Sequence, residues 1–245
     1  MGAKELDVVI TVIAVILVIM LWIMLYDSNR FVVRHYSLRD QRIKKSVKAV
    51  VLADLHNKRY GKQNERLLQA IDVIGPDMIL IAGDMLTAKP KATLDVAVGF
   101  LTELAKKYPV YYGNGNHEHR LKLYPENYGD MAGRYEEALT KIGIHRLVNE
   151  HKDLPEYGIR IYGSEIDRLY YKRFGIQPMD PEYLPGILGQ PSEEYFNILI
   201  AHDPDYFPKY ADWGADLVLS GHVHGGMVRV PFWGKGVVSP NVRLF

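Results

Sequence analysis

The chain contains no cysteine among its 245 residues, which excludes disulfide bonds and metal sites built from thiolate ligands. It also has almost no excess of charge, because 30 Lys and Arg residues are matched by 29 Asp and Glu residues, leaving a formal net charge of +1. Such a small net charge gives no electrostatic argument for nucleic-acid binding, and no clustered basic and aromatic pattern indicates a nucleic-acid groove. We find neither an internal repeat nor a low-complexity tract. Any metal chemistry must therefore use histidine, aspartate and asparagine.

A long apolar run lies near the N-terminus, from Val8 to Tyr26, with no charged residue between Asp7 and Asp27. As a helix it would be roughly 28 Å long at ~1.5 Å per residue, about the thickness of a hydrocarbon core. We interpret it as a retained membrane anchor, with Trp22 and Tyr26 suited to the membrane interface. A cleaved signal peptide and a buried helix of a soluble domain are the alternatives. The first of these is disfavoured because no small-residue cleavage site follows the run.

The charges that flank this run predict its orientation. Only Lys4 precedes it, whereas several basic residues follow it: Arg30, Arg34, Arg39, Arg42, Lys44, Lys45 and Lys48. The positive-inside bias predicts a single-pass protein of the cell membrane whose C-terminal body lies in the cytoplasm. The basic segment itself could rest on anionic lipid or be an ordinary solvated linker. We therefore expect a membrane anchor over residues 1–28, a basic juxtamembrane linker over 29–46 and a folded domain over 47–245.

Short apolar runs alternate with helical patterns throughout this domain. The predicted strands are Ala49–Ala53, which we interpret as buried, Met78–Ala82, Val110–Tyr112, Ile159–Tyr162 and Asn197–Ile200. The predicted helices are Gly61–Ile74, Lys91–Lys107 and Arg134–Ile142, with Gly143 as a stop signal. This alternation predicts an α/β fold with a sheet covered by helices on both faces.

Residues 165–195 break the alternation and contain four prolines among several large apolar side chains. These side chains are Tyr170, Tyr171, Phe174, Tyr183 and Leu184. The segment could be a cap over the site that holds an apolar substrate, or a structural excursion with its own small core. The sequence leaves both interpretations open.

Side chains that can bind metals follow five of the apolar runs. They are Asp54 and His56, then Asp84, then Asn116 and His117, then His202, and last His222 and His224 after the run Asp216–Leu219. In open α/β sheets, ligands bind beyond the carboxyl ends of the strands. Mixed nitrogen and oxygen donors suit Mn, Fe, Co or Zn rather than calcium. The set fits two cations roughly 3.5 Å apart, which would lower the pKa of a bridging water and neutralise phosphate oxygens.

The order of these motifs resembles that of the calcineurin-like metallophosphoesterases. The matching motifs are Asp54-x-His56, Gly83-Asp84, Gly115-Asn116-His117-Glu118, His202 and Gly221-His222-x-His224. The chain is most similar to membrane-anchored bacterial members that end in Gly-His-x-His-Gly-Gly, among them enzymes similar to UDP-2,3-diacylglucosamine pyrophosphatases. The resemblance implies a four-layer α/β/β/α metallophosphoesterase sandwich over residues 47–245, preceded by a transmembrane helix.

The resemblance also implies a role for each residue. Asp54, His56 and His224 would hold one divalent metal ion, Asn116, His202 and His222 the other, and Asp84 would bridge them. His117 would protonate or stabilise the leaving oxygen as the catalytic residue. Glu118 would orient a neighbour or be a solvated carboxylate. The metals would be two of Mn, Fe, Zn or Co.

Two departures from the family pattern stand out. Thr87 occupies a position where the family often has a second aspartate, which affects the tuning of the site more than its activity. Family members commonly continue beyond the histidine pair with further strands, whereas this chain stops at Phe245. A truncated C-terminal end and an unusually small last sheet are both compatible with this.

The predicted function is a dimetal-dependent phosphoesterase that hydrolyses a phosphodiester or pyrophosphate bond through a metal-bridging hydroxide. The substrate would be a small-molecule or lipid-linked phosphate ester close to the membrane, and no nucleic acid is expected. The alternatives are a non-catalytic metal-binding scaffold of the same fold and a phosphomonoesterase or cyclic nucleotide phosphodiesterase. The sequence predicts no oligomeric state.

Overall fold

The computed structural model describes residues 2–172, 175–224, 228–229 and 236–238. Its contacts divide the chain into two units, Met1–Leu38 and Arg39–Phe245. Phe174, Gly225 and Gly226, which contributed to the interpretations above, lie outside the described residues. The expected domain boundaries at residues 28 and 46 stay predictions.

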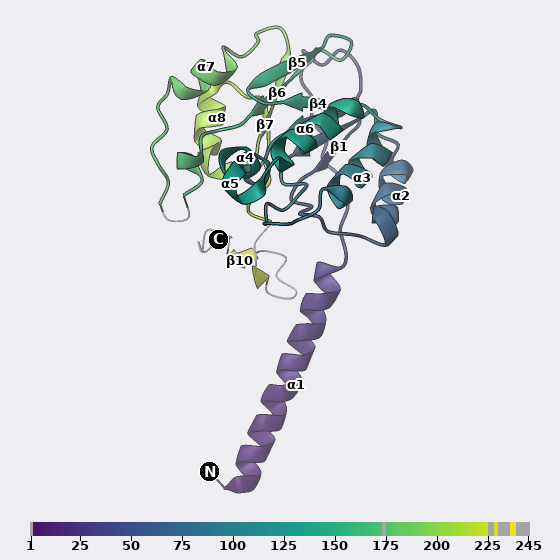
Figure 1. The fold of residues 1–245 in the computed structure, drawn as a ribbon, viewed down its shortest axis with the longest axis vertical. Helices are drawn as coiled ribbons and strands as arrows, with labels where there is room; N and C mark the ends of the chain where they lie inside the picture. Colours follow the sequence, from purple (N-terminus) through teal and green to yellow (C-terminus); the bar gives the residue numbers. More distant parts are fainter. Residues whose placement is uncertain (1, 173–174, 225–227, 230–235, 239–245) are drawn as a thin grey trace. The chain divides into compact units, whose positions relative to one another are not determined.

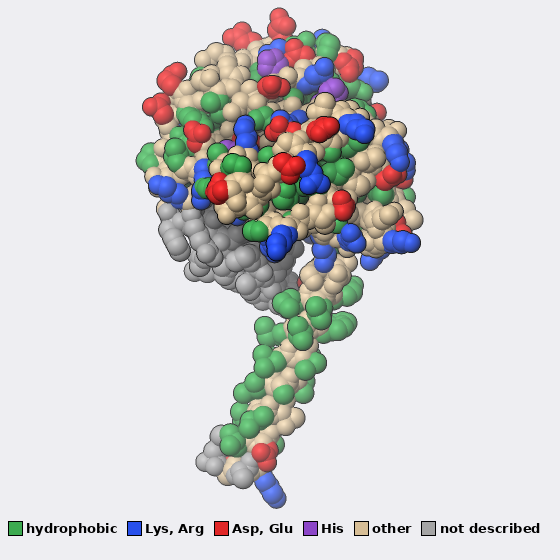
Figure 2. Space-filling model, in the orientation of Figure 1, with side chains coloured by type: hydrophobic (Ala, Val, Ile, Leu, Met, Phe, Trp, Pro, Cys, Tyr) green, Lys and Arg blue, Asp and Glu red, His purple; other side chains and the backbone are tan. Residues whose placement is uncertain are grey.

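The first unit is dominated by one long helix, α1 (Ala3–Ser28) (Figure 1). The most apolar 18-residue window within its segment Lys4–Ser28 has a mean hydropathy of 3.3 and no buried part. Figure 2 shows hydrophobic side chains along the whole length of α1. The alternative interpretation of this segment, a buried helix of a soluble domain, therefore does not fit α1. The helix is long and apolar enough to cross a membrane, and a membrane span and a signal sequence both fit it.

The second unit contains two four-stranded sheets and a small ribbon. The first sheet has the order β1 (Ala49–Leu52), β2 (Met78–Ala82), β3 (Val110–Gly113), β4 (His145–Leu147), all parallel. The second has the order β5 (Glu150–Leu154), β6 (Ile159–Ser164), β7 (Phe196–Ala201), β8 (Leu217–Leu219). Strands β5 and β6 are antiparallel, and the other pairs of this sheet are parallel. The ribbon pairs β9 (Val228–Arg229) with β10 (Gly236–Val238) in antiparallel fashion.

The two sheets pack face to face around a shared core. That core takes Met78, Leu80 and Ala82 from β2, and Ile159, Ile161, Phe196, Ile198 and Ile200 from β6 and β7. The outer face of the first sheet is covered by α2 (Glu65–Ile74), α3 (Asp95–Ala105) and α6 (Met131–Lys141) (Figure 1). The outer face of the second sheet packs on α7 (Tyr183–Leu188) and α8 (Phe207–Trp213) through Tyr162 and Leu199.

The predicted four-layer α/β/β/α sandwich is therefore confirmed, and the expectation of one sheet with helices on both faces is wrong. All five residues of β2 are buried. A strand buried on both sides has the same apolar sequence whether its second face meets helices or another sheet. For this reason the sequence of β2 could not distinguish the two arrangements.

Several local predictions also need correction. Strand β1 lies at the edge of its sheet and Val51 is 46% exposed, so the expectation of a buried strand is wrong. The expected helix Gly61–Ile74 begins with a 3-10 turn, η1 (Lys62–Asn64), because Gln63 and Asn64 have left-handed backbones. The helix expected over Lys91–Lys107 is shorter, and that expected over Arg134–Ile142 begins earlier, at Met131.

Other elements were not predicted at all. These are α4 (Asn116–Leu123), α5 (Pro125–Tyr128), α7, α8, β4, β5 and the short turns η2 (Arg168–Tyr170) and η3 (Pro204–Tyr206). Most of them are short, so they hold too few residues for a clear periodic pattern.

Part of the expected basic linker, from Arg39 onward, belongs to the second unit and packs against its strands and loops. The guanidinium of Arg42 donates to Asp216 Oδ1 at 2.7 Å and to the carbonyl of Tyr195 at 3.2 Å, and it lies over the ring of Phe196. It also donates to Asp40, which precedes it in the same segment. The alternative of an ordinary solvated linker is therefore wrong for Arg42, because its contacts hold residues 39–45 against the rest of the domain.

Candidate metal centre

The candidate ligands follow strands of both sheets and meet beyond the carboxyl ends of those strands. Asp54 and His56 follow β1, Asp84 follows β2, Asn116 and His117 open α4 after β3, His202 follows β7, and His222 and His224 follow β8. These strands are parallel within each sheet, so their carboxyl ends lie at the same edge of the sandwich.

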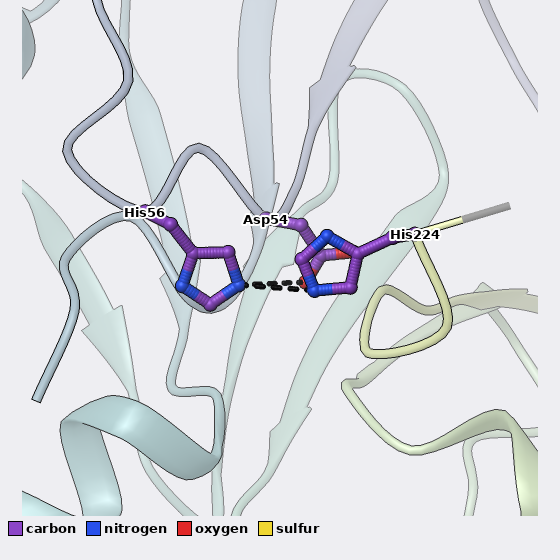
Figure 3. Close-up of side chains that lie close together, drawn as sticks. All are labelled: Asp54, His56 and His224. Atoms are coloured by element: carbon purple, nitrogen blue, oxygen red, sulfur yellow. Dashed lines mark hydrogen bonds and ion pairs between the residues drawn. The ribbon is translucent and has the colours of Figure 1, made fainter. Parts of the chain in front are cut away.

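His56 and His224 face each other across the centre (Figure 3). Their Nε2 atoms are 3.1 Å apart and their rings are stacked with centroids 4.8 Å apart. Asp54 Oδ1 lies 4.0 Å from His56 Nε2. Two nitrogen ligands of one tetrahedral zinc ion, each bonded at about 2.0–2.1 Å, lie about 3.3 Å apart. The observed separation of the two ring nitrogens therefore fits a shared cation.

Asp84 lies between histidines that come from different sheets. Its side chain is almost fully buried, and Oδ2 is 3.0 Å from His202 Nε2 and 3.7 Å from His56 Nε2. A carboxylate that reaches imidazoles on both sides has the position required of a bridging ligand.

His202 is held in the orientation that a metal ligand needs. Its Nδ1 lies 2.6 Å from the carbonyl of Ala82, which makes Nδ1 the donor and directs Nε2 into the centre. Nε2 is buried, and its one close polar neighbour among the described residues is Asp84 Oδ2 at 3.0 Å, without the alignment of a regular hydrogen bond. Burial by itself lowers the pKa of His202, but the carboxylate of Asp84 outweighs it and the pKa rises to about 10. A cation bound at Nε2 would displace this proton.

His222 and Asn116 form the other part of the centre. His222 Nδ1 lies 2.8 Å from Asn116 Oδ1, and the backbone N–H of His222 donates to Asp54 Oδ1 at 2.9 Å. Burial and the neighbouring His202 lower the pKa of His222 to about 4. The ring is therefore neutral at pH 7, as metal ligation requires.

His117 stands beside the candidate ligands with a defined tautomer. The backbone N–H of Ala88 donates to its Nδ1 at 2.8 Å, so the neutral ring carries its proton on Nε2. Its ring meets that of His56 edge to face at 4.7 Å, and its backbone N–H donates to Asp84 Oδ1. Burial lowers the pKa of His117 to about 4. The ring is therefore neutral at pH 7 and offers its Nε2–H as a hydrogen-bond donor next to the centre.

Comparison with known proteins agrees with this geometry. The family model of the calcineurin-like phosphoesterases matches residues 47–226. The chain belongs to the calcineurin-like phosphoesterase family. Members of this family are dimetal-dependent phosphoester hydrolases, and the matched span includes every candidate ligand and His117.

Three relatives illustrate the similarity. An uncharacterized metallophosphoesterase, YkuE of Bacillus subtilis (strain 168), is 27% identical over 81% of this chain and 65% of its own length. A second, Cj0846 of Campylobacter jejuni, is 30% identical over 76% of this chain and 46% of its own. The phosphodiesterase YaeI of Escherichia coli (strain K12) is 27% identical over 77% of this chain and 64% of its own. The chain thus spans less than two thirds of the length of these relatives.

In this calcineurin-like phosphoesterase, Glu118 is buried and accepts hydrogen bonds from four donors. They are the backbone N–H groups of Asp84, Met85 and Gly115 at 2.9–3.0 Å and the hydroxyl of Tyr112 at 2.7 Å. Burial and the nearby Asp84 raise the pKa of Glu118 to about 7. The interpretation as a solvated carboxylate is wrong, and the contacts support an orienting role for Glu118 toward the Asp84 loop.

The candidate ligands share an unusual backbone conformation that the sequence did not predict. Left-handed φ values occur at Asp54 (54°), His56 (48°), Asp84 (54°), His222 (68°) and His224 (53°). Such conformations are uncommon outside glycine and concentrate at functional sites, at roughly 1–3 kcal/mol each. The backbones also approach closely, since a Cβ on Gly83 would lie 2.5 Å from Gly115 Cα.

Residues of the segment 165–195 form a small core of their own, and one of them also borders the candidate centre. Tyr170 and Leu184 are buried with Tyr206 and Tyr210, so the segment has a small core against α8. Tyr171, however, places its ring edge against His222 at 5.5 Å. Tyr171 thus borders the centre, which sequence reasoning did not assign to this residue in particular.

Thr87, which stands where the family often has a second aspartate, supports the centre through a hydrogen bond to the backbone. Its hydroxyl donates to the backbone carbonyl of His56 at 3.1 Å. The side chain therefore supports the loop that carries His56.

Proposed function

We propose that this chain is a dimetal-dependent phosphoesterase that hydrolyses a phosphodiester or pyrophosphate bond. The observation that carries the proposal is the convergence of histidines from both sheets on Asp84, which lies 3.0 Å from His202 Nε2 and 3.7 Å from His56 Nε2. The name of the relative YaeI, a phosphodiesterase, supports the same bond type.

The donor set divides into two halves around Asp84. Asp54, His56 and His224 would hold one divalent ion, and Asn116, His202 and His222 the other. The buried Nε2 of His202, which faces the carboxylate of Asp84 at 3.0 Å without a well-aligned hydrogen bond, fits this role. When bound, two such ions activate water near neutral pH and neutralise phosphate oxygens during in-line attack. Nitrogen and oxygen donors without thiolates suit Mn, Fe, Co or Zn.

His117 would act on the leaving oxygen. Because Nδ1 accepts the N–H of Ala88, the neutral ring would stabilise that oxygen with a hydrogen bond donated by its Nε2–H. The edge-to-face contact with His56 keeps the ring next to the metal ligands. A hydrogen-bond donor aimed at developing negative charge typically contributes about 10²–10³-fold to a rate.

The proposed location is the membrane, with α1 as a single anchor and the phosphoesterase domain in the cytoplasm. The apolar length of α1 and the basic residues that follow it support this. Such an anchor would keep the domain close to lipid-linked phosphate esters, which makes them the proposed substrates. Protease accessibility in sealed vesicles tests the orientation.

Hydrolysis of bis(p-nitrophenyl) phosphate by the full chain in detergent, with Mn²⁺, Zn²⁺, Co²⁺ or Fe²⁺ added, tests the reaction. Metal-dependent turnover that is lost in Asp84→Asn and kept in Asp72→Asn, an exposed carboxylate on α2, is the expected result. Absence of turnover with every one of these cations would refute the proposal in favour of a non-catalytic scaffold of the same fold. A panel of lipid-linked diphosphates, cyclic nucleotides and monoesters then separates the substrate classes.

A further inference from the structure

A row of residues leads away from the candidate centre along one face of α4. Asn116, Arg120 and Tyr124 are spaced four apart, and the N–H of Tyr124 still bonds to the carbonyl of Arg120. Residues with this spacing are neighbours on a helix surface. Asn116 belongs to the centre through its contact with His222. Helical side chains lean toward the N-terminus of their helix, so the side chain of Arg120 leans toward the centre.

A second arginine reaches the same face from a distant part of the chain. Arg168, in η2, places its guanidinium 4.4 Å from the ring centroid of Tyr124. The cation–π contact fixes this charge at the far end of the row. Arginines from two separate segments therefore belong to the row that starts at Asn116, Arg120 by its spacing on α4 and Arg168 through its contact with Tyr124.

Neither guanidinium forms an ion pair or a hydrogen bond with any of the residues that the structure describes. Both side chains are exposed. Arg42, Arg146 and Arg160 each bind a carboxylate, so their guanidinium groups are not available in this way. The guanidinium group of an arginine with a structural role is usually paired with a carboxylate. The unpaired guanidinium groups of Arg120 and Arg168 are therefore available to bind a ligand.

The acidic groups near this row do not neutralise it. Glu165 accepts a hydrogen bond from Asn114 at 2.7 Å and lies 3.9 Å from Lys122 and from His119. Asp167 is exposed, and within the described part of the chain it forms no ion pair with its neighbour Arg168.

We propose that Arg120 and Arg168 form an anion-binding face that recognises a second anionic group of the substrate, beside the phosphate that is cleaved. The proposal rests on the proposed function and deepens it by naming a specificity determinant. A guanidinium binds a phosphate or carboxylate through two parallel hydrogen bonds. The second anionic group can belong to a soluble metabolite or to a lipid headgroup, which share this chemistry.

Two matched inhibitors test the proposal with the full chain in detergent. Glycerol 3-phosphate and 3-phosphoglycerate are similar in size, and only the second carries a carboxylate besides its phosphate. Their inhibition constants against bis(p-nitrophenyl) phosphate hydrolysis are measured for the wild type, Arg120→Gln, Arg168→Gln and the control Arg134→Gln. Arg134 is an exposed arginine on α6, near Asp130. Metal content and thermal unfolding of each variant are measured in parallel.

We expect the wild type to bind 3-phosphoglycerate about tenfold more tightly than glycerol 3-phosphate, since a charge-assisted hydrogen bond contributes a factor of this order. Arg120→Gln should reduce the ratio to about one, Arg168→Gln should reduce it less, and Arg134→Gln should keep it. Metal content should stay the same in all four proteins. Comparison of phosphatidylglycerol with cardiolipin in mixed micelles then shows whether the second group comes from a lipid.

A ratio near one in the wild type, or an unchanged ratio in Arg120→Gln, would overturn the anion-binding face while metal-dependent hydrolysis still supported the proposed function. An equal fall of the ratio in Arg134→Gln would also overturn it, because the effect would then be one of general charge. Failure of the wild type to hydrolyse bis(p-nitrophenyl) phosphate is a different result and refutes the proposed function itself.

Discussion

Gly115→Ala isolates the role of close backbone packing in shaping the candidate centre. Gly115 precedes α4 with φ −99° and ψ −176°, an extended conformation that alanine adopts without strain. A Cβ at this position would overlap Asp84 Oδ1 and lie 2.6 Å from Asp84 N and 2.7 Å from Asp84 Cγ. The only effect of the added methyl group is therefore a collision with Asp84.

Asp84 cannot retreat without losing other contacts. Its N–H donates to Glu118 Oε2 at 2.9 Å, and its Oδ1 accepts from the N–H of His117 at 2.8 Å. Overpacking a tight site costs about 1–3 kcal/mol, and loss of a hydrogen bond to a charged group adds about 1.5–3 kcal/mol. We expect Gly115→Ala to lower the free energy of unfolding by about 3 kcal/mol, which lowers Tm by about 6–12 °C for a domain of this size.

Gly133→Ala is the matched control. Gly133 lies inside α6, and a Cβ there would meet no heavy atom within 4 Å. Alanine in a helix interior is more favourable than glycine by about 0.5–1 kcal/mol, so this variant should unfold at a slightly higher temperature. The two identical chemical changes thus have opposite predicted signs.

Thermal unfolding followed by tryptophan fluorescence, with Zn²⁺ titration by calorimetry, measures both effects. Gly115→Ala should also bind Zn²⁺ more weakly, because it displaces the carboxylate between His56 and His202. If Gly115→Ala binds Zn²⁺ as the wild type does and unfolds within 1 °C of it, the packing argument around Asp84 is wrong.

Three further predictions concern separate parts of the molecule. His117→Ala should lose about 100-fold or more in kcat while keeping its metal, whereas His222→Ala should lose metal; equal metal content by elemental analysis would contradict this division. Hydrogen bonds from Arg42 hold the pKa of Asp40 at about 2, below its ordinary 3.8, so this carboxylate stabilises the fold above about pH 4 and the contribution is lost as pH falls through 2. The difference in urea midpoint between wild type and Asp40→Asn should follow that course, and a pH-independent difference would refute it. Leu199→Ala, at a fully buried position against α8, should destabilise the domain by about 2–5 kcal/mol in urea unfolding, and a loss below 1 kcal/mol would show that the site collapses without a cavity.

The identity and order of the candidate ligands could be predicted from the sequence because residues that can bind metal ions directly follow the predicted strands. Each ligand follows an apolar run, and runs of this kind become neighbouring strands whose carboxyl ends align. The structure indeed brings Asp54, His56 and His224 together, and Asp84 with His202. Their assignment to particular metal ions stays a prediction, as does the catalytic role of His117.

Other features of the centre could not be read in this way. Glu118 is a charged residue in a polar loop, and nothing local indicated that four donors would surround it. Tyr171 was one of several aromatic residues in segment 165–195, and only packing selects it as the neighbour of His222. The pairing of Arg168 with Tyr124 joins residues that no periodicity relates.

The sequence by itself determined the donor chemistry, through the absence of cysteine and the spacing of its histidines and aspartates, and the length of the apolar helix α1. Both properties are local, since they depend on residue type and on neighbours along the chain. Only the tertiary structure decided that two sheets share a core, that β1 is an edge strand and that Arg168 lies against Tyr124. These features depend on which distant segments pack together, and a strand buried on both sides has the same apolar sequence whichever partner covers it.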